Sequence, residues 1–437
     1  MSFRYALLLA LLPAAAVAQA PTWSVLPTSP SNVFRFDDIE APSPTTIYVA
    51  SGDGEVWRSL DGGESWALRY TDPDERYFRS LGFVSETHGW VGTLDAGQGE
   101  DVLLETTDGG QTFTPATDRI TGPLPFGICG IHALDDEAVY ATGDIAGGAY
   151  FLRTLDGGQT WTSLDLSAQA WFLVDVLFLD RQRGFLVGAA TGEPAGAIVL
   201  GTEDGGLTWT ERYRNDVASD WAWKIHFPTR DVGYVSIEST KTSGDGAILK
   251  TTDGGQTWQV LPVPSTSMQG IGFVDEQTGW IGGYRTPQVT TDGGQTWSSA
   301  FDLGSAVNRF AFFGDSLAYA VAERVYRYGD PPTASEPAPP AEPVLWVGDP
   351  YPNPFPERVL LPYRLPAPAE VTLEVFDAAG RRVALVRHGL RTAGPDELLW
   401  AARDDAGNEL PAGVYLYRLQ VGEETATGRL VKAGTGR

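Results

Sequence analysis

The chain has 437 residues and a formal net charge of −25 at pH 7, with 56 acidic and 31 basic side chains. This charge argues against nucleic acid or an anionic membrane as a partner, because binding phosphate groups requires basic surfaces. The single cysteine, Cys129, excludes an internal disulfide, and the length is sufficient for two or more domains.

The first twenty residues have the features of an export signal. Arg4 supplies the positive charge, residues 5–17 are apolar but too short to span a bilayer, and Ala18-Gln19-Ala20 matches a cleavage site. We therefore predict a signal peptide at residues 1–20 and an exported mature chain without a membrane span.

Six octets of the form TTDGGQTW follow, at residues 59–66, 106–113, 154–161, 202–209, 251–258 and 290–297. Their aspartates are spaced 47, 48, 48, 49 and 39 residues apart: Asp61, Asp108, Asp156, Asp204, Asp253 and Asp292. A period of 40–50 residues made of short strand-like runs is typical of a β-propeller. Each octet reads as a turn, in which the carboxylate accepts backbone N–H groups and Gly-Gly supplies positive φ.

Each repeat contains four strand-like runs, as in 268–275, 279–284, 288–294 and 295–301, which we designate A to D of one blade. After the sixth octet, VYRYGD at 325–330 matches VWRSLD at 56–61, but no seventh octet follows. The missing D strand is present at the other end, where PTWSVLP at 21–27 matches QTWQVLP at 256–262. The sequence therefore predicts an all-β, seven-bladed propeller whose N-terminal strand closes the last blade.

A second domain is predicted after the propeller. Residues 330–343 are rich in proline, and several short strand-like runs follow, with turn sequences DAAG at 377–380 and DDAGNE at 404–409. These runs suit an immunoglobulin-like sandwich. We expect a signal peptide at 1–20, a propeller at 21–330, a proline-rich linker at 331–345 and an Ig-like domain at 346–437.

The octets resemble the Asp-box (BNR) repeats of sialidase-type propellers. The wider pattern, a box followed about 30 residues later by a GW-V-G strand, resembles the photosystem II assembly-factor-like propellers. DPYPNPF at 349–355, DAAGRRV at 377–383 and PAGVYLYRL at 411–419 are similar to the type A C-terminal sorting domain of the type IX secretion system and to FlgD-like Ig modules. This second resemblance implies handling by the type IX machinery and delivery through the periplasm to the cell surface or the medium.

Propeller ligands commonly enter at the axis, so the A strands hold the candidate binding residues. Counting back four positions from a shared Phe gives Arg79 and Arg309, and Arg35 is expected at the matching place in blade one. If blades seven, one and two are neighbours, these arginines share one wall of the funnel and could bind a carboxylate. The alternative is that each pairs with a nearby acid, such as Asp37, Asp38 or Asp315, and seals the channel.

Blades four and five place further candidates near the same rim: Trp171, Trp221, Trp223 and Lys224. The aromatic rings could stack on a sugar or a peptide side chain, or could pack between blades.

No catalytic signature accompanies the repeat. Carboxylates are expected on the B–C loops, at Asp95, Asp144, Glu193 and Glu238, but the sequence does not pair them as a glycosidase requires. The sialidase signature Phe-Arg-Ile-Pro is absent, and no metal-ligand spacing or cofactor motif is present. We therefore expect a non-catalytic module that binds a protein or a glycan at its axial face. The alternatives are a glycoside hydrolase of the Asp-box superfamily and an assembly factor for a membrane protein complex.

Overall fold

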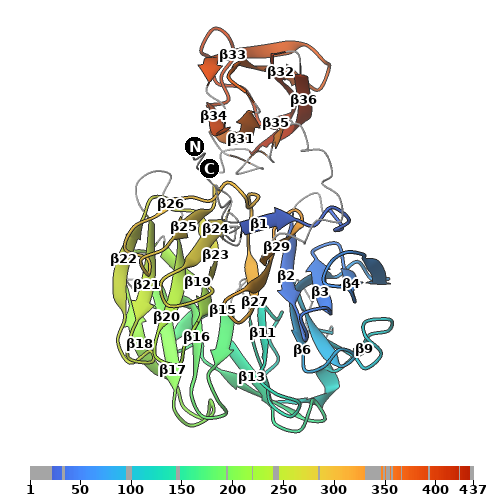
Figure 1. Cartoon of the computed structure of the whole chain (residues 1–437), viewed down its shortest axis with the longest axis vertical. Coiled ribbons are helices and arrows are strands. Elements are labelled where there is room, and N and C mark those ends of the chain that lie inside the picture. The colour runs from blue at the N-terminus through green and yellow to red at the C-terminus, as the bar shows by residue number, and fades with distance from the viewer. Residues whose placement is uncertain are drawn as a thin grey trace, which may run out of the picture.

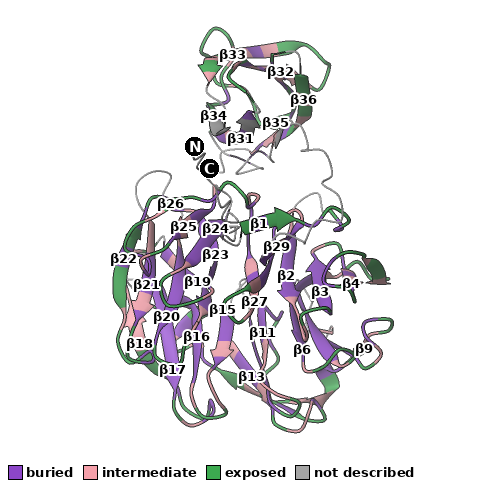
Figure 2. Ribbon diagram, in the orientation of Figure 1, coloured by how far each residue is buried: buried purple, intermediate pink, exposed green. Residues whose placement is uncertain are grey.

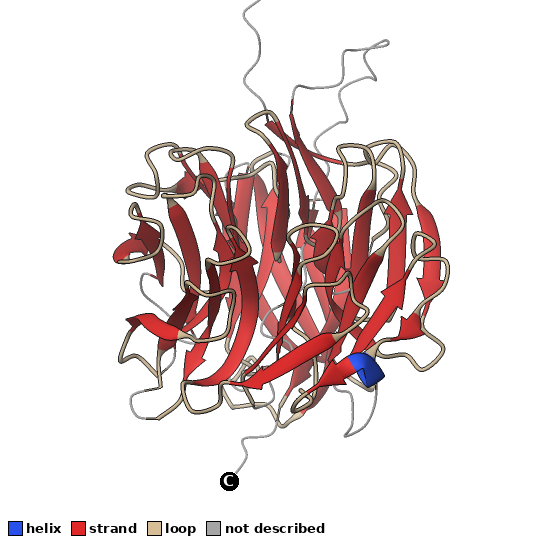
Figure 3. Ribbon diagram, turned by 90° about the horizontal axis from the view of Figure 1, so that it is seen from below, coloured by secondary structure: helices blue, strands red, loops and turns tan. Residues whose placement is uncertain are grey.

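The fold is described from a computed structural model of the chain. It describes residues 22–433 except 32–34, 95–100, 144–147, 193–194, 219, 240–245, 284–285, 330–345, 348–349, 351–354, 356–357, 366, 392–393 and 423. The predicted signal peptide and the whole of the predicted proline-rich linker therefore lie outside the described residues. Within them the chain is built from strands, with one short 3-10 helix at Thr117–Arg119 (Figure 3).

Seven sheets form the blades of a propeller. Each runs from an A strand near the axis to a D strand at the rim, so that β15 and β27 lie near the middle in Figure 1 and β18 and β22 at the periphery. In the order A to D, the strands of blade one are β2 (Phe36–Glu40), β3 (Ile47–Ser51), β4 (Glu55–Ser59) and β5 (Ala67–Thr71), those of blade two are β6 (Tyr77–Phe83), β7 (Gly89–Leu94), β8 (Leu103–Thr106) and β9 (Thr114–Pro115), and those of blade three are β11 (Gly130–Ala133), β12 (Val139–Gly143), β13 (Tyr150–Thr154) and β14 (Trp161–Asp165), with β10 (Ile120–Thr121) added outside. Blade four contains β15 (Ala170–Phe178), β16 (Gly184–Ala190), β17 (Ala197–Thr202) and β18 (Thr210–Arg214), and blade five contains β19 (Asp220–His226), β20 (Gly233–Ser239), β21 (Gly246–Thr251) and β22 (Gln259–Val263). Blade six contains β23 (Met268–Phe273), β24 (Gly279–Gly283), β25 (Gln288–Thr290) and β26 (Ser298–Ser299), and blade seven contains β27 (Arg309–Phe313), β28 (Leu317–Val321), β29 (Val325–Gly329) and β1 (Thr22–Val25).

The N-terminal strand closes the ring, as the sequence predicts. β1 pairs antiparallel with β29, from Thr22 opposite Gly329 to Val25 opposite Tyr326. The Trp23 ring is buried 5.4 Å from the ring of Trp280 in blade six, so the closing strand also contributes to the interface between blades six and seven. Closing the ring in this way leaves no terminal blade with an unpaired edge.

The Asp-box turns share one hydrogen-bond pattern, shown here for the box at 251–258. Asp253 accepts hydrogen bonds from the Thr251 hydroxyl at 2.8 Å and from the Thr257 hydroxyl at 2.6 Å and amide at 3.0 Å. The second glycine, Gly255, has a φ of 81°, and a Cβ there would lie 2.3 Å from a ring carbon of Phe185. Glycine is therefore required by both the backbone conformation and the close approach of the neighbouring blade.

The blades pack through apolar interfaces, and the strands between the axis and the rim are the most deeply buried (Figure 2). In alternate blades a buried B-strand tyrosine stacks on the A-strand phenylalanine of the next blade. The ring centroids are 3.9 Å apart for Tyr48 and Phe83, 3.5 Å for Tyr140 and Phe178, and 3.6 Å for Tyr234 and Phe273. These pairs contribute packing beyond simple area burial.

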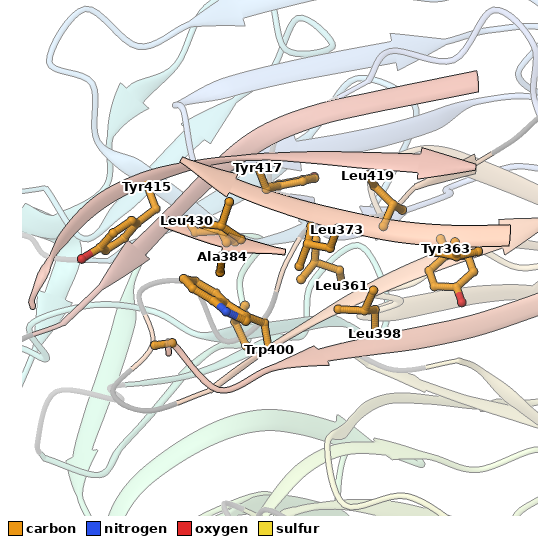
Figure 4. Close-up of a cluster of buried hydrophobic side chains, with 14 of the residues drawn as sticks. Leu361, Tyr363, Leu373, Ala384, Leu398, Trp400, Tyr415, Tyr417, Leu419 and Leu430 are labelled. Atoms are coloured by element: carbon orange, nitrogen blue, oxygen red, sulfur yellow. The ribbon is translucent and has the colours of Figure 1, made fainter. Parts of the chain in front are cut away.

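The C-terminal residues form an Ig-like pair of sheets with its own core. One sheet contains β30 (Trp346–Val347), β31 (Val359–Leu365) and β34 (Gly394–Trp400); the other contains β33 (Arg382–Arg391), β32 (Ala369–Asp377), β35 (Gly413–Val421) and β36 (Glu424–Lys432). Figure 4 shows side chains from both sheets meeting between them, among them Leu361, Leu373 and Trp400. The turn at 377–380 is a hairpin, as expected, with the Gly380 amide bonded to the Asp377 carbonyl at 2.9 Å.

Candidate axial binding site

Five A strands carry a β-bulge at the same point along the blade. The register of β2, β6, β15, β19 and β23 against their B strands shifts between Phe36 and Asp38, Phe78 and Ser80, Leu173 and Asp175, Ala222 and Ile225, and Met268 and Gly270. A bulge re-aims the side chain of its extra residue and is common beside functional sites. The polar and aromatic side chains at these bulges, Asp37, Arg79, Trp223, Lys224 and Gln269, are all buried.

The expected register of blade one is wrong by two residues. Asp37, and not Arg35, occupies the bulge that corresponds to Arg79 in blade two. The count fails because blade one has Ala41 at the position where five other blades have the shared Phe, so the sequence offers no reference residue for the register of this strand. Arg35 precedes β2, but its side chain still reaches the axis. Its Nε lies 3.3 Å from an oxygen of Asp37, and its Nη1 donates a hydrogen bond to Gln269 Oε1 in blade six.

Asp37 in blade one accepts hydrogen bonds from two side chains of blade two. Its carboxylate accepts a hydrogen bond from Arg79 Nη1 at 2.9 Å and one from the Tyr77 hydroxyl at 2.5 Å. Burial, followed by the negative charge of Asp37, raises the pKa of Tyr77. Tyr77 therefore stays protonated and donates to Asp37 at any physiological pH.

Arg309 reaches across the axis. Its Nη2 and Nη1 donate to the two carboxylate oxygens of Asp175 in blade four at 2.8 and 3.0 Å, and its Nε donates to Asp38 at 2.8 Å. Burial works against ionisation of both partners, but the Arg309 charge keeps the pKa of Asp175 below its usual range, and Asp175 with Asp38 raises the pKa of Arg309. The pair is therefore ionised, with a bidentate geometry that a lysine could not reproduce.

Lys224 and Trp223 complete the cluster from blade five. Lys224 Nζ lies 3.9 Å from an Asp175 oxygen, and burial, then the charge of Arg309, lowers the pKa of Lys224 to about 7. The Trp223 indole donates to Asn308 at 3.3 Å, and the Arg79 guanidinium lies 5.7 Å from the centroid of the Trp223 ring. We call the side chains of Arg35, Asp37, Asp38, Arg79, Asp175, Trp223, Lys224, Gln269 and Arg309 the axial cluster.

The cluster brings together the three arginines that the sequence singled out. Contacts of β2 with both β27 and β6 confirm that blades seven, one and two are neighbours. Each arginine is nevertheless paired with an acid, as the alternative interpretation held. Asp175, which the sequence analysis missed, takes the role considered for Asp315. It could have been found by the same count, since it lies three positions before Phe178, where Lys224 lies relative to Phe227.

The predicted aromatic residues lie beside the cluster and differ in exposure. Trp223 is buried, and the ring of the partly buried Trp221 lies 5.4 Å from that of Phe172, in an apolar cluster with Leu94. Trp171, by contrast, is 51% exposed, with its ring 5.2 Å from Phe172. Trp171 is therefore the accessible aromatic surface of the set, while Trp223 packs between blades.

The carboxylates considered for catalysis are not assembled by the described residues. Asp95, Asp144 and Glu193 lie outside them. Glu238 accepts a hydrogen bond from Gln269 Nε2 at 2.8 Å, and burial raises its pKa even though Arg35 opposes the shift. Across the described ranges no group of three or more His, Cys, Asp or Glu side chains could hold a metal ion. Those ranges also contain no helix of the length and apolarity needed to cross a bilayer.

Comparison with known families divides the chain in the same way as the sheets. Residues 169–267 match the family described as photosynthesis system II assembly factor YCF48, residues 288–299 match the BNR/Asp-box repeat, and residues 357–425 match the FlgD Ig-like domain. No curated protein sequence matches the chain significantly.

Solved structures with the same fold include the YCF48 propellers. The structure titled "YCF48 bound to D1 peptide" is 19% identical, covers 72% of this chain and 98% of its own, and has a TM-score of 0.53. YCF48 from Cyanidioschyzon merolae is 18% identical with a TM-score of 0.54, over 70% and 99% of the two chains. A GH74 enzyme from Niastella koreensis is 13% identical with a TM-score of 0.52, over 94% and 75%. At these identities the likeness establishes the fold: the protein is a BNR-type β-propeller with a C-terminal Ig-like domain.

Proposed function

We propose that the propeller is a non-catalytic binding module that takes an acidic segment of a protein partner at its axial cluster. One observation carries the proposal: the accessible charges of the cluster are cationic. Arg35 and Arg309 keep 11% and 18% of their side chains exposed, whereas Asp37, Asp38 and Asp175 are at most 2% exposed. In a chain with a net charge of −25, two partly exposed guanidinium groups favour a carboxylate ligand.

A protein partner is favoured over a glycan by two considerations. The exposed Trp171 offers a surface on which an apolar peptide side chain can pack. In addition, a structure with the same fold is titled as a complex with a peptide, D1 in the case of YCF48. Under this proposal the acidic group of the partner contacts Arg35 and Arg309, and its neighbouring side chains contact Trp171.

The test is a binding titration of the mature chain against a library of acidic peptides, read by fluorescence anisotropy. Arg35→Ala should weaken binding of the selected peptide about tenfold or more, since a charge-assisted contact contributes about 1.5–3 kcal/mol. Arg35→Lys should restore little, because lysine lacks the planar fork. Arg181→Ala, at an exposed ion pair with Asp135 on the rim, is the matched control and should bind normally. Equal affinity of Arg35→Ala and wild type would overturn the proposal.

The alternative function is that of a glycoside hydrolase, which would be shown by turnover of a glycan substrate. Screening the mature chain on sialosides and on plant and algal polysaccharides tests the hydrolase alternative. Glu238 is one of the described carboxyls of this region whose pKa burial raises, as a general acid requires; Glu40 is another. Hydrolysis that is abolished in Glu238→Gln would identify an enzyme and defeat the proposal of a non-catalytic module.

We also propose that the protein is exported and sorted to the cell surface or the medium. The support is the signal-like segment 1–20 and the resemblance of the C-terminal region to sorting domains, in the region that matches an FlgD Ig-like domain. Deletion of residues 345–437 should then trap a folded propeller in the periplasm. Normal yield of the truncated protein in the medium would contradict the role of this domain as an address.

A further inference from the structure

Two buried cationic nitrogens of the axial cluster lack a hydrogen-bond acceptor. Arg79 Nη2 and Lys224 Nζ have no hydrogen-bond partner within the described part of the chain, although both side chains are only 2% exposed and Lys224 Nζ lies 3.9 Å from Asp175. Burying a charged donor without an acceptor is costly, and such groups in native proteins usually contact an ordered water or an ion. The two nitrogens therefore indicate an acceptor that is not part of the polypeptide.

The two nitrogens belong to one electrostatic site. Lys224 follows Trp223 in β19, and the Arg79 guanidinium lies 5.7 Å from the centroid of the Trp223 ring. Arg79 is also among the charges that depress the pKa of Lys224. The two cations therefore lie within electrostatic range of each other, on blades two and five.

The axial cluster contains more positive than negative side chains. When Lys224 is protonated, the cluster contains four cationic side chains, Arg35, Arg79, Lys224 and Arg309, against three ion-paired carboxylates, Asp37, Asp38 and Asp175. Burial raises the pKa of Glu238, the further carboxyl beside Gln269. A water molecule would satisfy the two donors but would leave the surplus positive charge in a poorly solvated place. An anion would satisfy both.

We propose that Arg79 Nη2 and Lys224 Nζ hold one small monovalent inorganic anion, of the chloride type, within the axial cluster. The low exposure of both side chains selects for a single small ion over the carboxylate of a macromolecule, which we assign to the more accessible Arg35 and Arg309. The site is thus separate from the proposed partner site and is filled in the isolated protein.

Binding of the ion should depend on pH. Burial has the largest effect on the pKa of Lys224 and lowers it to about 7. The charged groups that act on Lys224 are, in decreasing order of effect, Arg309, Asp175, Arg79 and Asp38. An anion favours protonated Lys224, so anion affinity should be highest below pH 7 and should fall as the pH rises above it. Across the cluster, His132 stays neutral in this range, since burial lowers its pKa to about 4.

Bromide, a heavier analogue of chloride, tests the site directly. Crystals of the mature chain grown without chloride and soaked in sodium bromide should show an anomalous peak within hydrogen-bond reach of both Arg79 Nη2 and Lys224 Nζ. A water molecule at that position without an anomalous peak would overturn the proposal, whatever the outcome of the peptide experiments. This result needs no variant, so it decides the question even where a substitution prevents folding.

Chloride-35 NMR provides the solution test. The mature protein should broaden the chloride line at pH 6, and Lys224→Met should lose most of the excess broadening. Lys250→Met is the matched control, because Lys250 Nζ already donates to the Gly293 carbonyl at 2.9 Å, and it should broaden the line like wild type. Equal broadening by Lys224→Met and wild type would contradict the proposed site.

Discussion

Arg309 in blade seven and Asp175 in blade four form a bidentate ion pair across the propeller axis, with N–O distances of 2.8 and 3.0 Å. The two residues are 134 positions apart and lie on opposite sides of the ring. The pair therefore joins blades that share no strand pairing. Asp175 is fully buried, whereas the Arg309 side chain keeps 18% of its surface exposed.

Removal of this guanidinium should destabilise the fold. Arg309→Ala leaves Asp175 and Asp38 buried without their counter-ion, which costs about 3–5 kcal/mol in the free energy of unfolding. Arg309→Lys should recover only part, because one ammonium cannot serve both carboxylates. Urea denaturation at pH 7 measures the effect. Arg181→Ala at the exposed rim should leave the midpoint nearly unchanged. A wild-type midpoint for Arg309→Ala would mean that the arginine is free for ligand and is not a strut.

The paired tyrosines of blades five and three should respond differently to loss of the hydroxyl. Tyr234 donates to the Glu276 carbonyl at 2.9 Å, whereas the buried Tyr140 hydroxyl has no hydrogen-bond partner in the described structure. Both rings stack on the next blade in the same way. Tyr234→Phe should cost about 1 kcal/mol, and Tyr140→Phe should be neutral or slightly stabilising. Equal losses in thermal unfolding would refute the assigned hydrogen bonds.

Ring closure depends on the N-terminal strand. Trp23→Ala removes a buried ring that contacts Trp280, Phe310 and Tyr328, and should cost about 3–5 kcal/mol. Ser24→Ala in the same strand is the control, since that side chain is exposed and should change little. Chemical denaturation of both variants measures the difference. If Trp23→Ala unfolded like wild type, the N-terminal strand would stabilise the ring through its backbone pairing alone, and the Trp23 side chain would contribute nothing.

The Asp boxes should make the propeller sensitive to acid. Hydrogen bonds from the Thr257 hydroxyl and amide lower the pKa of Asp253 from 3.8 to about 2, and Asp108, Asp204 and Asp292 have similar values. A lowered folded-state pKa stabilises the fold above pH 4, and this contribution is lost as the pH falls towards 2. Denaturant midpoints measured from pH 5 to pH 2 should therefore fall steeply.

One box can be separated from the rest by Asp253→Asn. The variant should be about 1 kcal/mol less stable at pH 7, allowing for the exposure of the turn, and should approach wild type at pH 2. A constant difference at every pH would show that the carboxylate charge contributes nothing and that only the shape of the turn matters.

The sequence by itself determined the features that are local or repeated. Six Gly-Gly turns mark the blades because only glycine tolerates their backbone conformation, and the match of 21–27 to a D strand predicts the closed seventh blade, which β1 confirms. The same count places Arg79 and Arg309 on the A strands, and both form buried ion pairs of the axial cluster.

Only the tertiary structure decided what these side chains contact. A bulge is a two-against-one pairing between strands, so the sequence of β2 alone could not show that Asp37 and not Arg35 occupies it. The partner of Arg309 is Asp175 because the closed ring brings blade four within reach of blade seven, a distance that no local pattern encodes. The unsatisfied nitrogens of Arg79 and Lys224 likewise exist only where several blades bury their charges together.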